Sequence, residues 1–333
     1  MSWLYVTEPG ARLIKRGGCY VIQRENETIC EVPAGLVEGA VIIDTVQVSS
    51  QVIVDFLHNN VPLTWLSTTG KFFGRLESTQ NQDVMRQKAQ FDLQENDPFR
   101  VALSKRIVFG KIYNQMTILR RYQRTAQLPN MDDVLKQMRL IANKIDRDKE
   151  IEAIMGHEGA IARLYFGQLG KIVPKEFAFE RRSRRPPEDA FNAMLSFGYT
   201  LLIYDFYTAL TNLGLHPYVG FLHSLRNGPP ALASDLMEPW RPAVVDALCL
   251  SLISHHEIKP EHFTEKDPDT GGVYLDRVGR RIFIRAYEKK MQGVNKYFKG
   301  EYSWRYSVGM ECDSFRQALE HKDLSLLRPF IIR

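Results

Sequence analysis

The chain lacks the features of membrane, secreted and disulfide-stabilised proteins. Its 333 residues include only four cysteines, which lie far apart and form no CxxC pair: Cys19, Cys30, Cys249 and Cys312. This usage argues against a zinc ribbon or a redox motif and favours reduced thiols. No apolar run reaches the roughly 20 residues that span a membrane, and the first residues lack the pattern of a secretory signal. We therefore expect a cytoplasmic protein.

The chain also lacks an internal repeat, a low-complexity tract and a strong excess of one charge. Apolar residues make up 44% and charged residues 25%, as in ordinary globular proteins, and the length allows two domains. The net charge is only +5, but Arg and Lys gather in residues 100–149, 181–185 and 277–305. Such clusters favour a polyanionic partner, although solvated helix faces produce the same pattern.

The first 78 residues are predicted to form a β-rich N-terminal domain. Short β-branched stretches recur there, and turn-forming residues such as Gly17 and Gly18 separate them. One helix is expected within residues 50–59. The segment 79–98 is polar and poor in strand formers, so we interpret it as an interdomain linker that carries a short helix.

Helical periodicity dominates from residue 99 onward. Helices are expected over 101–122, 132–144, 148–169, 187–213, 242–255 and 286–299, with a small hairpin over 271–284 and a loose C-terminal tail. The predicted fold class is therefore α+β with two domains: a small N-terminal β-rich domain, and a larger, mostly α-helical domain over 99–333.

Glu158 is a carboxylate at a position where helical spacing calls for an apolar residue. The expected core-facing stripe of its helix comprises Ile151, Ile154, Met155, Ile161, Ala162, Tyr165 and Leu169. A carboxylate is rarely buried unless it is paired or bound to a metal, because desolvation costs several kcal/mol. Glu158 is thus a candidate for chemistry, and pairing with an arginine is the alternative.

Two further segments offer metal-ligating side chains. His223 ends a Gly- and Pro-punctuated loop, and Asp235 and Glu238 stand three residues apart, so that one helical turn places both acids on one side. Taken singly, His223 could be a core histidine and the acids could be helix-terminal residues. Together with Glu158 they supply three carboxylates and one imidazole, which suit Mg²⁺ or Mn²⁺ and the hydrolysis or transfer of a phosphodiester.

The four arginines Arg181, Arg182, Arg184 and Arg185 precede a proline-started helix. Planar guanidinium groups bind phosphates bidentately, so these side chains are candidates for contacts with a DNA backbone. A solvated basic loop is the alternative interpretation.

Four motifs resemble those of one family, the CRISPR spacer-acquisition integrase, the large, metal-dependent subunit of the adaptation complex. They are Gly-His-Glu-Gly-Ala-Ile-Ala-Arg-Leu-Tyr-Phe at 156–166, Arg-Arg-Pro-Pro-Glu-Asp-Ala-Phe-Asn at 184–192, Gly-Leu-His-Pro-Tyr-Val-Gly-Phe-Leu-His at 214–223 and Asp-Leu-Met-Glu-Pro-Trp-Arg-Pro at 235–242. They occur in the family's order and spacing. The N-terminal stretches 33–50 and 69–71 are similar to its first domain, so the resemblance covers nearly the whole chain.

The resemblance implies a catalytic set of Glu158, His223, Glu238 and Asp235, in which the first three bind Mg²⁺ or Mn²⁺ and Asp235 is an accompanying acid. It implies a homodimer formed through the N-terminal domain and a small ferredoxin-like partner subunit. It also implies double-stranded DNA substrates, with 3′-hydroxyl ends of protospacer DNA joined to a CRISPR repeat by transesterification. One departure is His216, where many members have Asp, at a position that is not a ligand.

Two other functions use the same residues. The chain could be a stand-alone metal-dependent nuclease that acts on branched DNA in repair. It could also be a non-catalytic DNA-binding scaffold in which Glu158 is paired with arginine. A transcription factor is disfavoured, because the sequence has no helix-turn-helix or zinc-ligand spacing.

Overall fold

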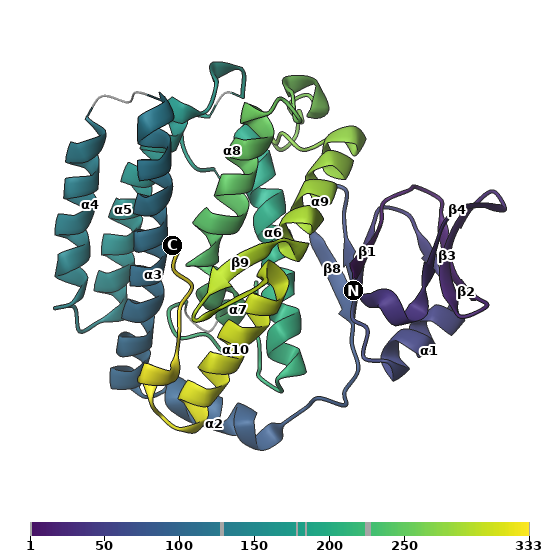
Figure 1. Ribbon diagram of the computed structural model, residues 1–333, viewed down its shortest axis with the longest axis horizontal. Helices are drawn as coiled ribbons and strands as arrows, with labels where there is room; N and C mark the ends of the chain where they lie inside the picture. The colour runs from purple at the N-terminus through teal and green to yellow at the C-terminus, as the bar shows by residue number, and fades with distance from the viewer. Residues whose placement is uncertain (1, 127–129, 178, 184, 224–227, 333) are drawn as a thin grey trace. The chain divides into compact units, whose positions relative to one another are not determined.

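The computed structural model describes residues 2–126, 130–177, 179–183, 185–223 and 228–332 (Figure 1). The chain divides into two compact units, residues 1–82 and 83–333. The first is rich in strands and the second is mostly helical, which confirms the predicted fold class. Among the described residues, no helix combines the length and the hydropathy that a membrane crossing requires.

Two four-stranded sheets form the N-terminal unit. The first has the order β1-β5-β7-β8, parallel except for its last pair, with β1 (Ser2–Val6), β5 (Val37–Ile43), β7 (Leu63–Leu66) and β8 (Phe72–Leu76). The second has the order β4-β3-β2-β6 and is antiparallel except for its β2–β6 pair, with β2 (Arg12–Arg16), β3 (Cys19–Arg24), β4 (Glu27–Pro33) and β6 (Gln47–Val48).

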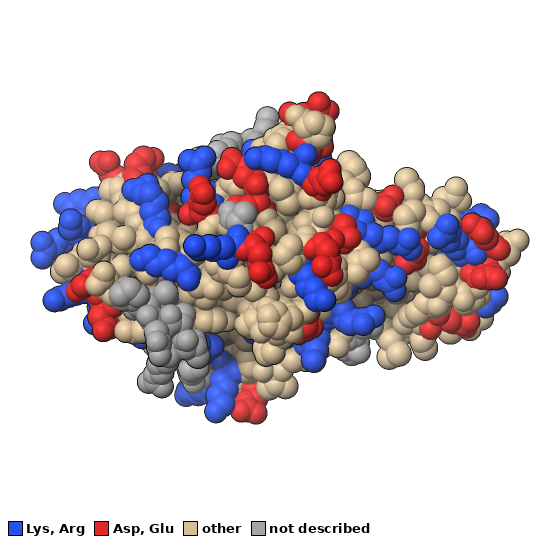
Figure 2. Space-filling view, turned by 90° about the horizontal axis from the view of Figure 1, so that it is seen from above, with Lys and Arg blue, Asp and Glu red and all other residues tan. Residues whose placement is uncertain are grey.

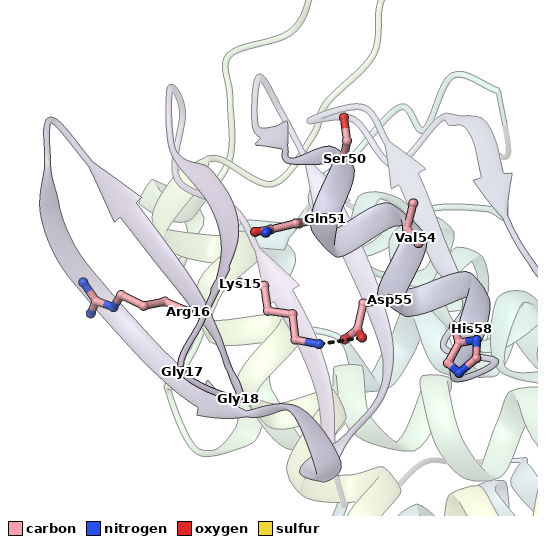
Figure 3. A pocket seen from close by; sticks show the side chains of 9 residues that line it. All are labelled: Lys15, Arg16, Gly17, Gly18, Ser50, Gln51, Val54, Asp55 and His58. Carbon is pink, nitrogen blue, oxygen red and sulfur yellow. Dashed lines mark hydrogen bonds and ion pairs between the residues drawn. The ribbon is translucent and has the colours of Figure 1, made fainter.

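Both sheets and helix α1 (Ser50–His58) share one core, to which Leu13, Ile42 and Phe56 contribute fully buried side chains. Figure 3 shows a hollow beside α1, in which Lys15 forms an ion pair with Asp55 at 2.6 Å. Asp55 also accepts a hydrogen bond from Tyr20, so its charge is satisfied inside the unit. None of the predicted site residues lies in this unit.

The helical unit contains α2 (Val84–Gln94), α3 (Asp97–Ala126), α4 (Met131–Ile145), α5 (Ile151–Ile172), α6 (Ala190–Asn212), α7 (Ala231–Met237), α8 (Ala247–Ser254), α9 (Arg277–Gln292) and α10 (Trp304–Glu320). Helices α3, α4 and α5 pack side by side (Figure 1), and α6 packs against α7 and α10. A π-helical segment, η3 (Pro242–Asp246), leads into α8 and contacts α3 and α6. This packing brings α3, α5 and the end of α7 together.

The segment 79–98 was predicted to be a linker. Most of it instead belongs to the helical unit, because α2 packs inside that unit. Gln90 is fully buried and donates hydrogen bonds to the carbonyls of His216 and Val219, both at 2.9 Å. Arg86 donates to the Leu213 carbonyl and pairs with Glu320. The polar composition that suggested a linker is therefore used for internal hydrogen bonds.

The C-terminal part also differs from the prediction. The segment expected as the second strand of a hairpin over 271–284 lies inside α9, and the helix expected over 286–299 ends at Gln292. A hairpin of β9 (Val294–Tyr297) and β10 (Gly300–Ser303) follows, with Phe298 in its turn at a φ of +52°. The expected loose tail instead contains α10, whose buried face includes Phe315 and Cys312.

Candidate metal centre

Helix α5 places Glu158 on its core-facing side. Ile154 and Ile161, which precede and follow it by about one helical turn, are fully buried, and 22% of the Glu158 side chain is exposed. Met155, expected in the core, is instead 42% exposed. The buried stripe runs through positions 151, 154, 161, 165 and 169, with the partly buried Glu158 between 154 and 161 and the exposed Met155 beside it.

The Glu158 carboxylate pairs with Lys111, a buried residue of α3 that the sequence analysis did not select. Its Nζ lies 2.5 Å from Glu158 Oε1 and 2.6 Å from Glu238 Oε2. Two carboxylates from different segments thus contact a single positive charge. The arrangement shows that the site can hold a cation between Glu158 and Glu238.

Glu238 follows the last residue of α7 and is almost completely buried. Its Oε1 lies 3.2 Å from Nη1 of Arg241. Burial alone would raise the pKa of Glu238, but the charges of Arg241, Lys111 and His223 outweigh it and lower the pKa to about 2. Glu238 is therefore ionised at neutral pH and is available to a cation.

Asp235 fixes the loop that carries His223. Its Oδ2 accepts hydrogen bonds from the amides of Phe221 and Leu222 at 2.6 and 2.9 Å. Its Oδ1 accepts from the His223 amide at 3.1 Å and lies 2.6 Å from His223 Nδ1. Asp235 is fully buried and committed to these contacts, so it acts as a positioning group.

The loop approaches α7 closely because residue 220 is glycine. A Cβ on Gly220 would meet the Ala231 Cβ at 2.7 Å and Asp235 Oδ2 at 2.9 Å. Burial lowers the pKa of His223, but the hydrogen bond and the charge of Asp235 and the charge of Glu238 produce a net increase above 6.5. His223 is linked to the Glu238 segment through Asp235, which contacts its Nδ1 and lies three positions before Glu238.

The four predicted site residues thus occupy one neighbourhood as two pairs. Glu158 and Glu238 meet at Lys111, and His223 is held by Asp235. Among the residues that the structure describes, no three His, Cys, Asp or Glu side chains are close enough together to hold a metal ion in this arrangement. The Lys111 ammonium group occupies the position between the two glutamates.

A third buried acid, Asp246 at the end of η3, lies close to this neighbourhood. It accepts hydrogen bonds from Tyr165 of α5 at 2.8 Å and from Tyr199 of α6 at 2.6 Å, and burial raises its pKa to about 6. The guanidinium groups of Arg241 and Arg182 lie 4.9 and 5.4 Å from the centre of the Tyr199 ring. Tyr199 thus connects the Glu238 segment with the arginine loop.

The four predicted DNA-binding arginines have different environments. Arg182 is turned inward, where it donates to Asn192 Oδ1 at 2.8 Å and to the Ser196 hydroxyl at 3.2 Å. Arg181 and Arg185 are exposed, and Arg184 lies outside the described residues. On the face seen in Figure 2, the basic and acidic side chains drawn among the described residues alternate without forming a continuous basic band.

Lys111 was missed, although its pattern matches the one that identified Glu158. It lies on the apolar face of α3 beside Ile107, Val108 and Ile112, all of which are buried. A charged side chain flanked by such positions needs a partner or a function. The same test applied to α3 would have selected it.

The fold and the site define a two-unit α+β protein with an acid pair and a carboxylate-held histidine in its helical unit. Residues 4–289 match the family model described as CRISPR associated protein Cas1, and the chain belongs to this family. It is 31% identical over 326 residues to the CRISPR-associated endonuclease Cas1 of Mycobacterium tuberculosis, covering 96% of this chain and 94% of the relative. It is 34% identical over 290 residues to a CRISPR-associated endonuclease Cas1 of Thermus thermophilus, covering 86% and 84%.

Solved structures share the fold at lower sequence identity. A casposase bound to an integration product superposes with a TM-score of 0.84 at 23% identity, covering 97% of this chain and 91% of the casposase chain. A Cas1 protein from Thermotoga maritima gives 0.82 at 21% identity, covering 96% and 97%. A Cas6-RT-Cas1–Cas2 complex gives 0.84 at 22% identity, covering 99% of this chain and 36% of the other. The resemblance seen in the four motifs is thus confirmed.

Proposed function

We propose that this chain is a metal-dependent DNA integrase and endonuclease of CRISPR adaptation, which joins 3′-hydroxyl ends of protospacer DNA to a CRISPR repeat by transesterification. One observation carries the proposal: two carboxylates, Glu158 and Glu238, converge on a single cation position beside a histidine oriented by a buried acid. Family membership and relatives named endonucleases support this activity. The casposase of similar fold is bound to an integration product, which supports joining as well as cleavage.

The residues present fit a hard divalent cation. Oε2 of Glu238 is buried, and the Lys111 ammonium group 2.6 Å away is its positively charged partner, so this oxygen already binds a cation. Carboxylate oxygens with one imidazole nitrogen suit Mg²⁺ or Mn²⁺. In the proposal Glu158, His223 and Glu238 would hold this ion, which when bound favours deprotonation of the attacking oxygen and neutralises charge on the phosphate.

The chain's own residues supply position and charge. The Asp235 contact with Nδ1 leaves Nε2 of His223 as the ring nitrogen for ligation, as in other carboxylate–histidine pairs at metal sites. Arg241 holds Glu238 in place from the side of Oε1. No protein nucleophile is required, because the DNA end brings the attacking hydroxyl. Exposed Arg181 and Arg185 would contact the DNA backbone.

The remaining expectations concern the assembly. We propose that the N-terminal unit mediates a homodimer and contacts a small ferredoxin-like subunit in the cytoplasm. The Cas6-RT-Cas1–Cas2 complex contains a Cas2 component beside Cas1, which supports such a partner.

Strand transfer by the wild type and by Glu158→Ala tests the proposal. A duplex with free 3′-hydroxyl ends is supplied with Mn²⁺ and a supercoiled target carrying a repeat, with and without the small subunit. The wild type should join the DNA ends, and Glu158→Ala should lower the rate more than about 100-fold. The exposed Glu152→Ala on the same helix is the matched control and should retain activity.

The alternatives give different results. Cleavage of branched DNA without joined products would indicate the stand-alone repair nuclease. Joining that survives Glu158→Ala would indicate a scaffold, in which Glu158 only completes an ion pair.

A further inference from the structure

Lys111 has an environment that few lysines have. Its side chain is buried, with an exposed fraction of 9%, and its Nζ lies within 2.6 Å of two carboxylates from segments far apart in the sequence. The formal charges of Glu158 and Glu238 are balanced by those of Lys111 and Arg241. Without Lys111, two carboxylates would face each other at a largely buried position, which is strongly unfavourable.

We propose that Lys111 is a resident cation that holds the acid pair together in the metal-free protein and is displaced when a divalent ion binds. The inference rests on the proposed function, because it takes Glu158 and Glu238 to be ligands. Mg²⁺ binds carboxylate oxygens at about 2.0–2.1 Å. An ion at that distance from Glu158 Oε1 and Glu238 Oε2 would occupy the space in which Nζ now lies, so both cations cannot be held by these oxygens together.

Displacement is feasible because lysine carries its charge on a flexible four-carbon stem. The affinity for a divalent ion therefore depends on the free-energy difference between the acid pair bound to Lys111 and the acid pair bound to the ion. Each divalent ion that binds must first break two short ion pairs, whereas a protein without the ammonium group would offer the bare acid pair. Lys111 therefore lowers the affinity of the site for the ion while keeping the empty site folded.

Mn²⁺ binding followed by electron paramagnetic resonance, together with thermal unfolding with and without Mn²⁺, tests the proposal on the full chain. Lys111→Met removes the charge and keeps the length of the stem. It should bind Mn²⁺ at least tenfold more tightly than the wild type, and Mn²⁺ should raise its melting temperature by a larger amount. Lys105→Met on the same helix is the control and should bind as the wild type does, because Lys105 donates to the Asp146 carbonyl and not to the acid pair.

Lys111→Arg separates charge from packing, because it keeps a cation between the acids. Its affinity for Mn²⁺ should not exceed that of the wild type. An increase in Mn²⁺ affinity as large as that of Lys111→Met would overturn the proposal. If Lys111→Met folds only in the presence of Mn²⁺, the ion has replaced the ammonium group, as proposed. Failure to fold at every Mn²⁺ concentration would overturn the proposal.

Glu158→Gln distinguishes this inference from the proposed function. Loss of Mn²⁺ binding in Glu158→Gln, combined with unchanged or weaker binding in Lys111→Met, would refute the role of Lys111 and leave the metal site standing. Wild-type affinity in Glu158→Gln would refute the metal site itself, and the role of Lys111 with it.

Discussion

Replacement of Asp235 by Asn should remove the orientation of His223 while leaving the shape of the site almost unchanged. The Asp235 carboxylate accepts from three backbone amides and contacts His223 Nδ1. The asparagine side chain has only one acceptor oxygen. Its NH₂ group must therefore face two of the four nitrogens that contact the Asp235 carboxylate. If the NH₂ group takes the place of Oδ1, it can regain a bond with His223 only by donating to Nδ1, which places the ring proton on Nε2.

The structure gives the size of both effects. One or two buried donors lose their acceptor, at about 1–3 kcal/mol each, so we expect Asp235→Asn to lower the free energy of unfolding by about 1–6 kcal/mol. A proton on Nε2 removes the lone pair that would bind the ion, and loss of a partner of this kind typically weakens metal affinity 10–100-fold.

Denaturant unfolding without metal measures the first effect, and Mn²⁺ titration with strand transfer measures the second. Asp276→Asn is the matched control, because Asp276 caps α9 through the Gly279 amide and asparagine caps a helix equally well. The reasoning is refuted if Asp235→Asn binds Mn²⁺ within twofold of the wild type and transfers strands at the wild-type rate.

Two further predictions concern the arginine loop and the C-terminal helix. The double variant Arg181→Ala/Arg185→Ala should weaken duplex binding. The slope of log K against log salt should become shallower by roughly 1.8, because two phosphate contacts are lost. An unchanged slope would indicate that the loop is solvated and does not contact the DNA. Burial raises the pKa of Glu311 to about 8, although Trp240 and the Phe330 amide donate to it. Because the folded pKa exceeds the unfolded value of 4.5, the folded state binds the proton more tightly and stability falls as pH rises from about 5 to 8. The free energy of unfolding of the wild type, measured by denaturation across this range, should fall by up to about 1.4 kcal/mol per pH unit. Glu311→Gln should lack this decrease, and equal slopes in the two proteins would contradict the raised pKa of Glu311.

Much of the fold follows from local signals in the sequence. Recurring β-branched stretches predicted the β-rich N-terminal unit, and helical periodicity predicted α3 to α6. The hairpin of β9 and β10 was missed because a helix was continued through Gly293 and Phe298. Gly293 ends α9, and Phe298 adopts a positive φ in the turn. Attention to Gly293 would have ended the helix correctly, whereas a phenylalanine carries no sequence signal for a positive φ.

The site was predictable only in part, because its chemistry depends on contacts between distant segments. The apolar neighbours of Glu158 identified it, but its partner Lys111 lies 47 positions away on another helix. The bonds from Asp235 to the loop 221–223 span 12 to 14 positions and have no local signature. The inward turn of Arg182 depends on Asn192 and Ser196, which the run of arginines alone could not reveal.

The most direct test of the central claim is a crystal structure of the protein with Mn²⁺, in which anomalous scattering locates the ion. We expect one peak bound by Glu158, Glu238 and Nε2 of His223, with the Lys111 ammonium group moved away from the acids. A peak that contacts none of these side chains, or Lys111 still between the two glutamates at saturating Mn²⁺, would contradict it.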